Sequence, residues 1–180
     1  MRLIKQLFIS LFVFGFIFFL ISLLLPSSVQ VSKSVLINVP RDSVTATLLR
    51  IEDWKKWSPF LQDSTIQYNI ISPAKANWKA ADGTLNSIQL EQYTVDSIFA
   101  IIRSGDKIVF NSGFTVKMSA DNNSVSKVEW WMLERLKWYP WEKFYGLFSE
   151  SFKETYVENS LEMFRRYAEV RYSRNDNLSK

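Results

Sequence analysis

The sequence contains no cysteine and no histidine. Without cysteine there is no disulfide framework, no zinc–thiolate site and no thiol nucleophile. Without histidine there is no imidazole general base, no Ser-His-Asp triad and no histidine metal ligand. The common hydrolytic machinery is therefore excluded, and the sequence predicts neither a metal nor a cofactor.

A strong net charge is also missing. The 180 residues carry a formal charge of +4, and Arg2 and Lys5 supply two of those charges. The rest of the chain has 20 basic and 18 acidic residues, which is too balanced for a nucleic-acid footprint, so no nucleic-acid partner is expected. A late cluster of arginines is expected to lie on a solvated helix face: Arg165, Arg166, Arg171 and Arg174.

What the sequence has instead is a long apolar run near its start. Leu7 to Leu25 are nineteen residues without a charge, and a helix of that length rises about 28 Å, close to the roughly 30 Å hydrocarbon core of a bilayer. A cleaved signal peptide is the alternative, since Arg2 and Lys5 form a positive n-region. Its apolar region would be shorter and would end in small residues, where this chain has Leu-Leu-Leu-Pro. We therefore predict that residues 1–26 are an uncleaved single-pass anchor in the lipid bilayer.

The side of the membrane on which the rest of the chain lies depends on the flanking basic residues. Arg2 and Lys5 on one side balance Lys33 and Arg41 on the other, so the charge count decides nothing. A very short N-terminal tail ahead of a long domain favours a cytoplasmic tail. We therefore expect an extracytoplasmic domain.

Residues 27–172 are predicted to form one α+β domain. Residues 29–39 alternate apolar and polar side chains, which is typical of a half-buried strand. Helical spacing after Pro40 predicts a short helix that ends around Trp54. Three polar turn signals then separate strand-like runs and predict an antiparallel meander: Asp82-Gly83, Ser104-Gly105-Asp106 and Asp121-Asn122-Asn123.

The segment from about Trp141 to Tyr172 has helical periodicity and a broad apolar arc. An arc of that width predicts a long C-terminal helix that the sheet substantially encloses. Residues 173–180 are polar and are expected to form a disordered tail.

The first third of this domain carries a recognisable motif: a strand, Asn-x-Pro, a helix, then Trp-x-x-Trp-x-Pro. The residues that form it are Asn38, Pro40, Trp54, Trp57, Ser58 and Pro59. This pattern resembles the opening of the START-like, or polyketide cyclase/dehydrase-like (SRPBCC), superfamily, and element order extends the resemblance over residues 29–171. The resemblance implies a helix-grip fold, in which a curved antiparallel sheet wraps around a long C-terminal helix, with a cavity that binds hydrophobic small molecules. Some members are enzymes, and many have no known activity.

A cavity of that kind would be lined by large apolar side chains. The predicted ligand-binding residues are Trp57, Phe60, Phe110, Phe114, Trp130, Phe152 and Tyr156. For the neighbouring rings of Trp54 and Trp57, packing in the core and direct ligand contact both remain open, because an indole can bury its area while its N–H keeps a partner.

Glu134 is a weak candidate for a catalytic residue. Strand alternation places it on one face with Val128, Trp130 and Met132, and a carboxylate buried among apolar groups could act as an acid or base. The alternative is that Glu134 pairs with Arg103 or lies in water beyond the strand end.

A second aromatic cluster surrounds Pro140. It contains Trp138, Tyr139, Trp141, Phe144, Tyr145 and Phe148. Trp and Tyr are enriched at the boundary between lipid and water, so contact with the membrane interface is one interpretation. Packing over the cavity is the other.

Three hypotheses for function follow. The first is a membrane-anchored domain that binds a hydrophobic or amphipathic small molecule, including a lipid, between the sheet and the C-terminal helix. The second is a cyclase- or isomerase-like enzyme that uses Glu134. The third is a structural or protein-interaction module whose cavity is filled by its own side chains.

Overall fold

The computed structural model describes residues 2–62, 67–119, 122 and 124–178, without the side chains of residues 2–3, 60, 109–110 and 175–178. The helices are α1 (Arg2–Leu24), α2 (Arg41–Leu48), α3 (Ile51–Trp54), α4 (Pro59–Gln62) and α5 (Pro140–Leu178). The strands are β1 (Ser28–Ile37), β2 (Tyr68–Ser72), β3 (Lys75–Lys79), β4 (Leu85–Thr94), β5 (Ser97–Ser104), β6 (Lys107–Met118) and β7 (Ser126–Arg135).

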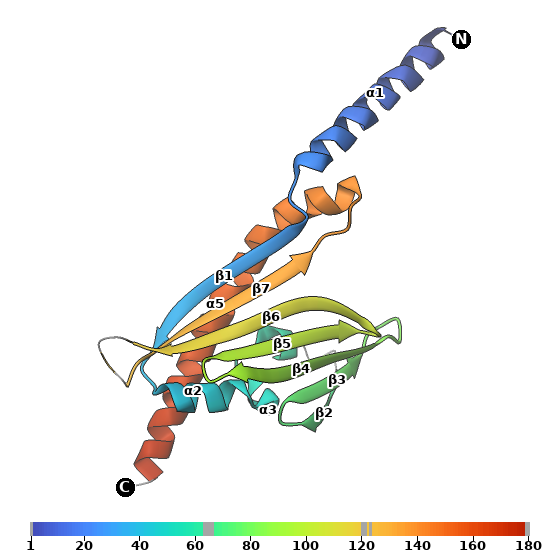
Figure 1. Ribbon diagram of the computed structural model, residues 1–180. Helices are drawn as coiled ribbons and strands as arrows, with labels where there is room; N and C mark the ends of the chain where they lie inside the picture. Colours follow the sequence, from blue (N-terminus) through green and yellow to red (C-terminus); the bar gives the residue numbers. More distant parts are fainter. Residues whose placement is uncertain (1, 63–66, 120–121, 123, 179–180) are drawn as a thin grey trace.

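The seven strands form one sheet in the order β1-β7-β6-β5-β4-β3-β2. Every neighbouring pair is antiparallel, and the first strand pairs with the last over its whole length, from Ser28 opposite Arg135 to Ile37 opposite Ser126. Figure 1 shows the curved sheet in front of α5, with α1 extending away from the rest of the chain. The predicted helix-grip α+β fold is confirmed.

The single helix predicted before Trp54 is two helices. α2 ends at Leu48 and α3 begins at Ile51. The backbone N–H of Ile51 donates a hydrogen bond of 2.7 Å to the carbonyl oxygen of Pro73. A donor used in this way does not bond to the preceding turn of helix, and the chain therefore bends between α2 and α3.

Helix α5 packs on the sheet through small side chains at its start and apolar ones further along. Gly146 and Ser149 are buried in its first turns, and Val157, Leu161 and Phe164 are buried beyond them. The helix continues to Leu178, so the domain boundary at residue 172 stays a prediction. The predicted enclosure of the whole apolar arc is wrong for the first half of the helix, where several aromatic side chains are exposed: Trp141, Tyr145, Phe148 and Phe152.

An aromatic cluster forms the centre of the core. The ring of Trp57 is fully buried and lies 4.9 Å from Trp54, 6.3 Å from Trp130 and 4.8 Å from Phe164, measured between ring centroids. Rings at these separations and at steep interplanar angles make favourable edge contacts in addition to their area burial. Trp57 therefore acts as a packing residue that joins α3, the sheet and α5.

The end of α1 is fixed against the start of α5. The rings of Phe18 and Phe144 stack with a centroid separation of 4.3 Å. Lys143 is buried, and its Nζ donates hydrogen bonds to the Leu25 carbonyl oxygen at 3.2 Å and to the Ser27 hydroxyl. The connection between helix and domain is thus a packed, hydrogen-bonded junction.

Candidate functional site

A partly open cavity of about 440 Å³ lies between the sheet, α3 and α5. A volume of this size is within the range of small-molecule sites. The cavity is lined by Trp54, Ser58, Trp78, Asn86, Ile88, Ala100, Ile102, Arg103, Ser104, Ser112, Trp130, Met132, Lys153 and Tyr156.

Three tryptophans form most of the apolar wall. Trp54, Trp78 and Trp130 are each at most 6% exposed. The Trp54 Nε1–H donates to the Leu48 carbonyl oxygen at 2.8 Å, and the Trp130 Nε1–H donates to the Ser112 hydroxyl at 2.6 Å. Because these two N–H groups are already satisfied within the protein, their rings contribute apolar surface to the cavity.

Other residues that line the cavity are polar. We call four of them the polar end: Asn86, Arg103, Ser104 and Lys153. Asn86 and Ser104 face each other across β4 and β5. Ile102 and Ser104 face the cavity opposite Ile88 and Asn86 of β4. Arg103 lies between them on β5 and also borders the cavity, but it is exposed.

Two groups at the polar end lack partners. The Asn86 Oδ1 atom is buried and accepts no hydrogen bond from the described part of the chain. No carboxylate among the described residues forms an ion pair with Arg103. A polar group on a ligand would satisfy the buried Asn86 acceptor. Arg103 is exposed and solvated, and it could add a charge-assisted hydrogen bond to an acidic group on a ligand.

Glu134 lies beside the polar end but in an ion pair. Its carboxylate accepts a hydrogen bond from Lys153 Nζ, which also donates to the Ser149 hydroxyl at 3.1 Å. The partner weighed from the sequence was Arg103. Glu134 is on β7 opposite Val29 of β1, at the far side of β6 from the β5 residue Arg103, and α5 brings Lys153 closer.

The predicted ligand-binding residues do not all line the cavity. Trp130 and Tyr156 line the cavity, whereas Trp57 and Phe114 are fully buried in the core next to it. Phe152 is 78% exposed and points away from the cavity. The side chains of Phe60 and Phe110 lie outside the described part of the chain.

The exposure of Phe152 has a simple geometric cause. Residues in an α-helix are rotated by about 100° from one to the next. The helix approaches the sheet through Gly146 and Ser149, which are both buried, and this choice turns Phe148 and Phe152 away from the sheet. The sequence analysis expected the bulky side chains to be buried. In the structure the small side chains are buried instead, because they let the helix approach the sheet closely.

Sequence reasoning missed most of the polar end and one tryptophan. Trp78 lies in a run that alternates polar and apolar residues as a strand does, so it could have been predicted as a lining residue. Asn86, Arg103 and Lys153 have ordinary surface-like contexts in the sequence, and the pairing of β4 with β5 brings the first two together at the cavity.

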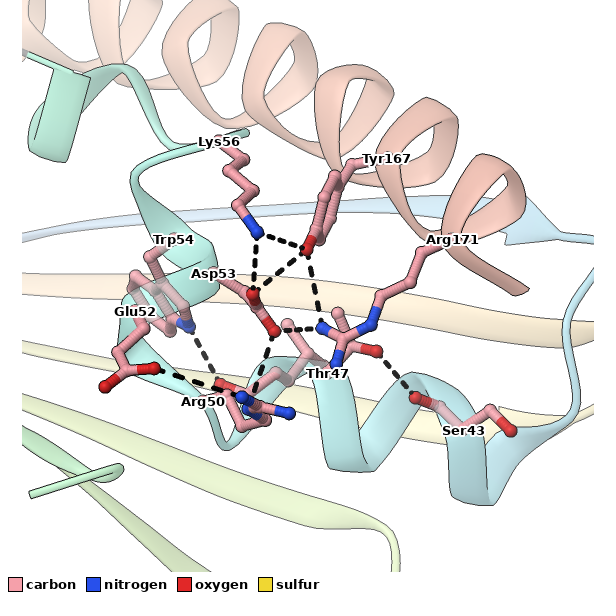
Figure 2. Close-up of polar contacts among 10 residues, drawn as sticks. Ser43, Thr47, Arg50, Glu52, Asp53, Trp54, Lys56, Tyr167 and Arg171 are labelled. Atoms are coloured by element: carbon pink, nitrogen blue, oxygen red, sulfur yellow. Dashed lines mark hydrogen bonds and ion pairs between the residues drawn. The ribbon is translucent and has the colours of Figure 1, made fainter. Parts of the chain in front are cut away.

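A separate polar cluster joins α3 to the second half of α5 (Figure 2). The Asp53 carboxylate, only 6% exposed, accepts hydrogen bonds from the Tyr167 hydroxyl at 3.0 Å, from Lys56 Nζ at 3.3 Å and from Arg171. Arg50 lies 3.8 Å from the same carboxylate. Asp53 directly precedes Trp54, so α3 presents a tryptophan to the cavity and a carboxylate to this cluster.

The cluster stabilises an ionised carboxylate. Burial alone would raise the pKa of Asp53, but the hydrogen bonds from Arg171 and Tyr167 and the charge of Arg171 outweigh it and hold that pKa below its ordinary value. The hydrogen bonds to Tyr167 and Asp53 in turn raise the pKa of Lys56. A carboxylate held so firmly in its charged form is a poor general base, and we interpret the cluster as a clamp between α3 and α5.

Metal binding has no obvious location in the part of the chain that the structure describes. Among these residues, no group of three or more aspartate and glutamate side chains lies close enough to hold a metal ion.

Comparison with known proteins supports the fold alone. No protein-family model matches the chain, and no match is found among curated proteins. A protein of unknown function from Staphylococcus aureus aligns with a TM-score of 0.58 at 10% identity, over 79% of this chain and 94% of its own. The Zhui aromatase/cyclase from a Streptomyces species aligns with a TM-score of 0.57 at 12% identity, over 80% and 95%. A START superfamily protein from Mycobacterium smegmatis aligns with a TM-score of 0.52 at 14% identity, over 81% and 98%.

These alignments cover most of this chain and nearly all of each of the three solved structures, which indicates a shared fold. The chain therefore has a START-like helix-grip fold, as the motif in residues 31–60 predicted. At identities this low the similarity carries no substrate or activity to this protein.

Proposed function

We propose that the protein binds an amphipathic small molecule in the cavity while α1 anchors it in a membrane. The observation that carries the proposal is the composition of the cavity: a tryptophan-rich apolar wall with a polar end at Asn86, Arg103 and Lys153. The apolar body of a ligand would gain about 25 cal/mol for each Å² removed from water. An acidic or hydroxyl group on the ligand would fix its orientation at the polar end.

The anchoring part of the proposal is supported by the length and composition of α1. Residues Ile4–Leu24 form a helix of 21 residues that is apolar enough to cross a membrane and is largely free of contacts with the domain. A helix of this length spans about 31 Å, which matches the hydrocarbon core. In this proposal the short N-terminal tail is cytoplasmic and the domain lies on the other side.

Two alternative functions receive less support. A module filled by its own side chains is disfavoured by the cavity of about 440 Å³. An enzyme that uses Glu134 is disfavoured by the ion pair with Lys153, which occupies the carboxylate. Neither alternative accounts for the Asn86 Oδ1 atom, which is buried without a hydrogen-bond partner in the described part of the chain.

The test uses the full chain purified in lipid nanodiscs from its own host. Native mass spectrometry and lipid extraction should reveal a reproducible bound mass, and a fluorescent long-chain carboxylate should displace it. Ala100→Leu adds a side chain that fills the cavity, so retention should fall at least severalfold. Ala46→Leu makes the same change at an exposed position of α2 and serves as the control. Equal retention by wild type and Ala100→Leu would refute binding in this cavity.

A further inference from the structure

One face of α5 is apolar and exposed. Trp141, Tyr145, Phe148 and Phe152 recur at the spacing i, i+4, i+7, i+11 and are between 57% and 78% exposed. Residues at this spacing form a single line along a helix. We call them the aromatic stripe. Contiguous exposed apolar surface of this kind marks an interaction site.

We propose that the aromatic stripe lies in the same membrane leaflet in which α1 ends. This inference rests on the proposed anchoring by α1. Figure 1 shows the start of α5 beside the end of α1, with both helices running in broadly the same direction. The stacked rings of Phe18 and Phe144 place these two residues at about the same level.

Helix geometry then sets the depth of the stripe. Phe18 lies six residues before Leu24, or about 9 Å along α1, and Phe152 lies eight residues beyond Phe144, or about 12 Å along α5. Even with the two helices parallel, Phe152 extends only about 3 Å past the level of Leu24, within a headgroup layer that is about 5–7 Å thick on each side. The remaining stripe residues lie at or below the level of Leu24.

The chemistry of the stripe also favours a bilayer over a protein partner. Trp and Tyr gather at both interfaces of membrane proteins, where one part of the ring is apolar and another is wet. Trp138 and Tyr139 precede the stripe, and Trp138 is 72% exposed. Trp138 and the stripe therefore place aromatic side chains beside the last turns of a candidate membrane span.

This placement gives the cavity access to lipid. Tyr156 lies one turn beyond Phe152 and lines the cavity. Lys153 also lines it, and its Nζ lies 6.0 Å from the ring centroid of Tyr145, a stripe residue. The stripe and the polar end of the cavity are thus neighbours, and an amphipathic molecule would move between leaflet and cavity with little exposure to water.

The absence of native cysteine makes a direct test clean. Phe148→Cys and Phe152→Cys would each carry a nitroxide label in the full chain, reconstituted in phosphatidylcholine vesicles. Val170→Cys is the matched control, because Val170 is an exposed apolar residue on the same helix, about 27 Å beyond Phe152. Phe12→Cys reports separately on α1. Collisions with oxygen, which concentrates in lipid, are compared with collisions with a water-soluble nickel chelate.

The expected result is an excess of oxygen collisions at positions 12, 148 and 152 and an excess of nickel collisions at 170. Nickel excess at 148 and 152 with oxygen excess at 12 would overturn the stripe proposal and leave the anchor intact. Shielding from both reagents at 148 and 152 would also overturn it, in favour of a protein partner. Nickel excess at 12 would refute the anchoring itself. Ligand retention in the same vesicles distinguishes each of these from failure of the proposed cavity.

Discussion

At the scale of single residues, position separates the roles of two neighbouring side chains that are almost equally buried. Trp57 is enclosed by rings on all sides, whereas Trp54 both packs on it and lines the cavity. The sequence analysis placed Trp57, and not Trp54, among the predicted ligand-binding residues, although packing and ligand contact both stayed open; Trp54 is the one that lines the cavity. Burial alone could not decide, since both rings are at most 3% exposed; their position relative to α5 and β6 decided it.

Asp53 is expected to make stability depend on pH. Its folded pKa is below the unfolded value of about 3.9, so its contribution is fully present above about pH 4 and is lost as the pH falls through the folded pKa. Asp53→Asn should lower the free energy of unfolding by about 1.5–3 kcal/mol at neutral pH, the range for hydrogen bonds to charged groups.

Thermal unfolding of wild type and Asp53→Asn between about pH 5 and pH 2 tests this linkage. The difference in stability between the two proteins should shrink as the pH falls. Asp42→Asn, at a side chain 88% exposed, should show no such difference. A difference in stability that stays constant across this range would contradict the interpretation of the Asp53 cluster as a clamp.

Two glycines provide a matched comparison of close packing. A Cβ at Gly113 would lie 2.6 Å from the Trp131 ring and 2.9 Å from the Ile98 carbonyl oxygen, and that backbone atom has no room to move. Gly113→Ala should therefore cost about 1–3 kcal/mol. A Cβ at Gly146 would meet mainly a Leu136 methyl, which can rotate, and Ala gains about 1 kcal/mol in a helix.

Urea unfolding of Gly113→Ala and Gly146→Ala measures the contrast. Gly146→Ala should be the milder change. A larger loss of stability for Gly146→Ala than for Gly113→Ala would show that the Leu136 side chain cannot move aside for the added methyl group.

At the scale of elements, sequence patterns predicted the main helices and strands, but they predicted the wrong environment for one face of α5. Alternation and turn signals at Asp82-Gly83 and Ser104-Gly105-Asp106 correspond to the turns after β3 and β5. The N-terminal half of α5 was expected inside the sheet because its residues are bulky. Periodicity reveals that a helix has an apolar face, but it does not reveal whether protein or another apolar phase covers that face.

Lys143 is expected to hold α1 against α5. Lys143→Met removes the donor to the Leu25 carbonyl, and a hydrogen bond from a charged group contributes about 1.5 kcal/mol or more, equivalent to about tenfold in an opening equilibrium. Hydrogen exchange of the amides of Leu25, Ser27 and Ser28 should therefore accelerate by about that factor. Lys137→Met, at a side chain 68% exposed, is the control and should leave exchange unchanged.

At the scale of the whole molecule, the proposed ligand binding predicts a gain in stability. A ligand that binds only the folded state stabilises it by about 2.7 kcal/mol at a hundredfold excess over Kd. The midpoint of unfolding should rise on addition of a saturating amphipathic carboxylate, and Ala100→Leu should abolish most of the rise. An equal rise in both proteins would place binding elsewhere on the molecule.

The full site could not have been predicted from the sequence because it depends on long-range pairing. Trp130 and Tyr156, which were predicted from their size and periodicity, line the cavity. Asn86 and Arg103 are brought together at the cavity by the pairing of β4 with β5, which local pattern does not encode.

The pairing of β1 with β7 also sets an order of events during synthesis. β1 emerges directly after the apolar α1, yet its only strand partner in the sheet order ends at Arg135, about a hundred residues later. Until β7 is made, β1 has an unpaired edge, which is prone to wrong pairing. Ser32, Lys33 and Ser34 lie in the middle of that edge, and their polarity protects a strand that must remain single while the rest of the sheet is assembled.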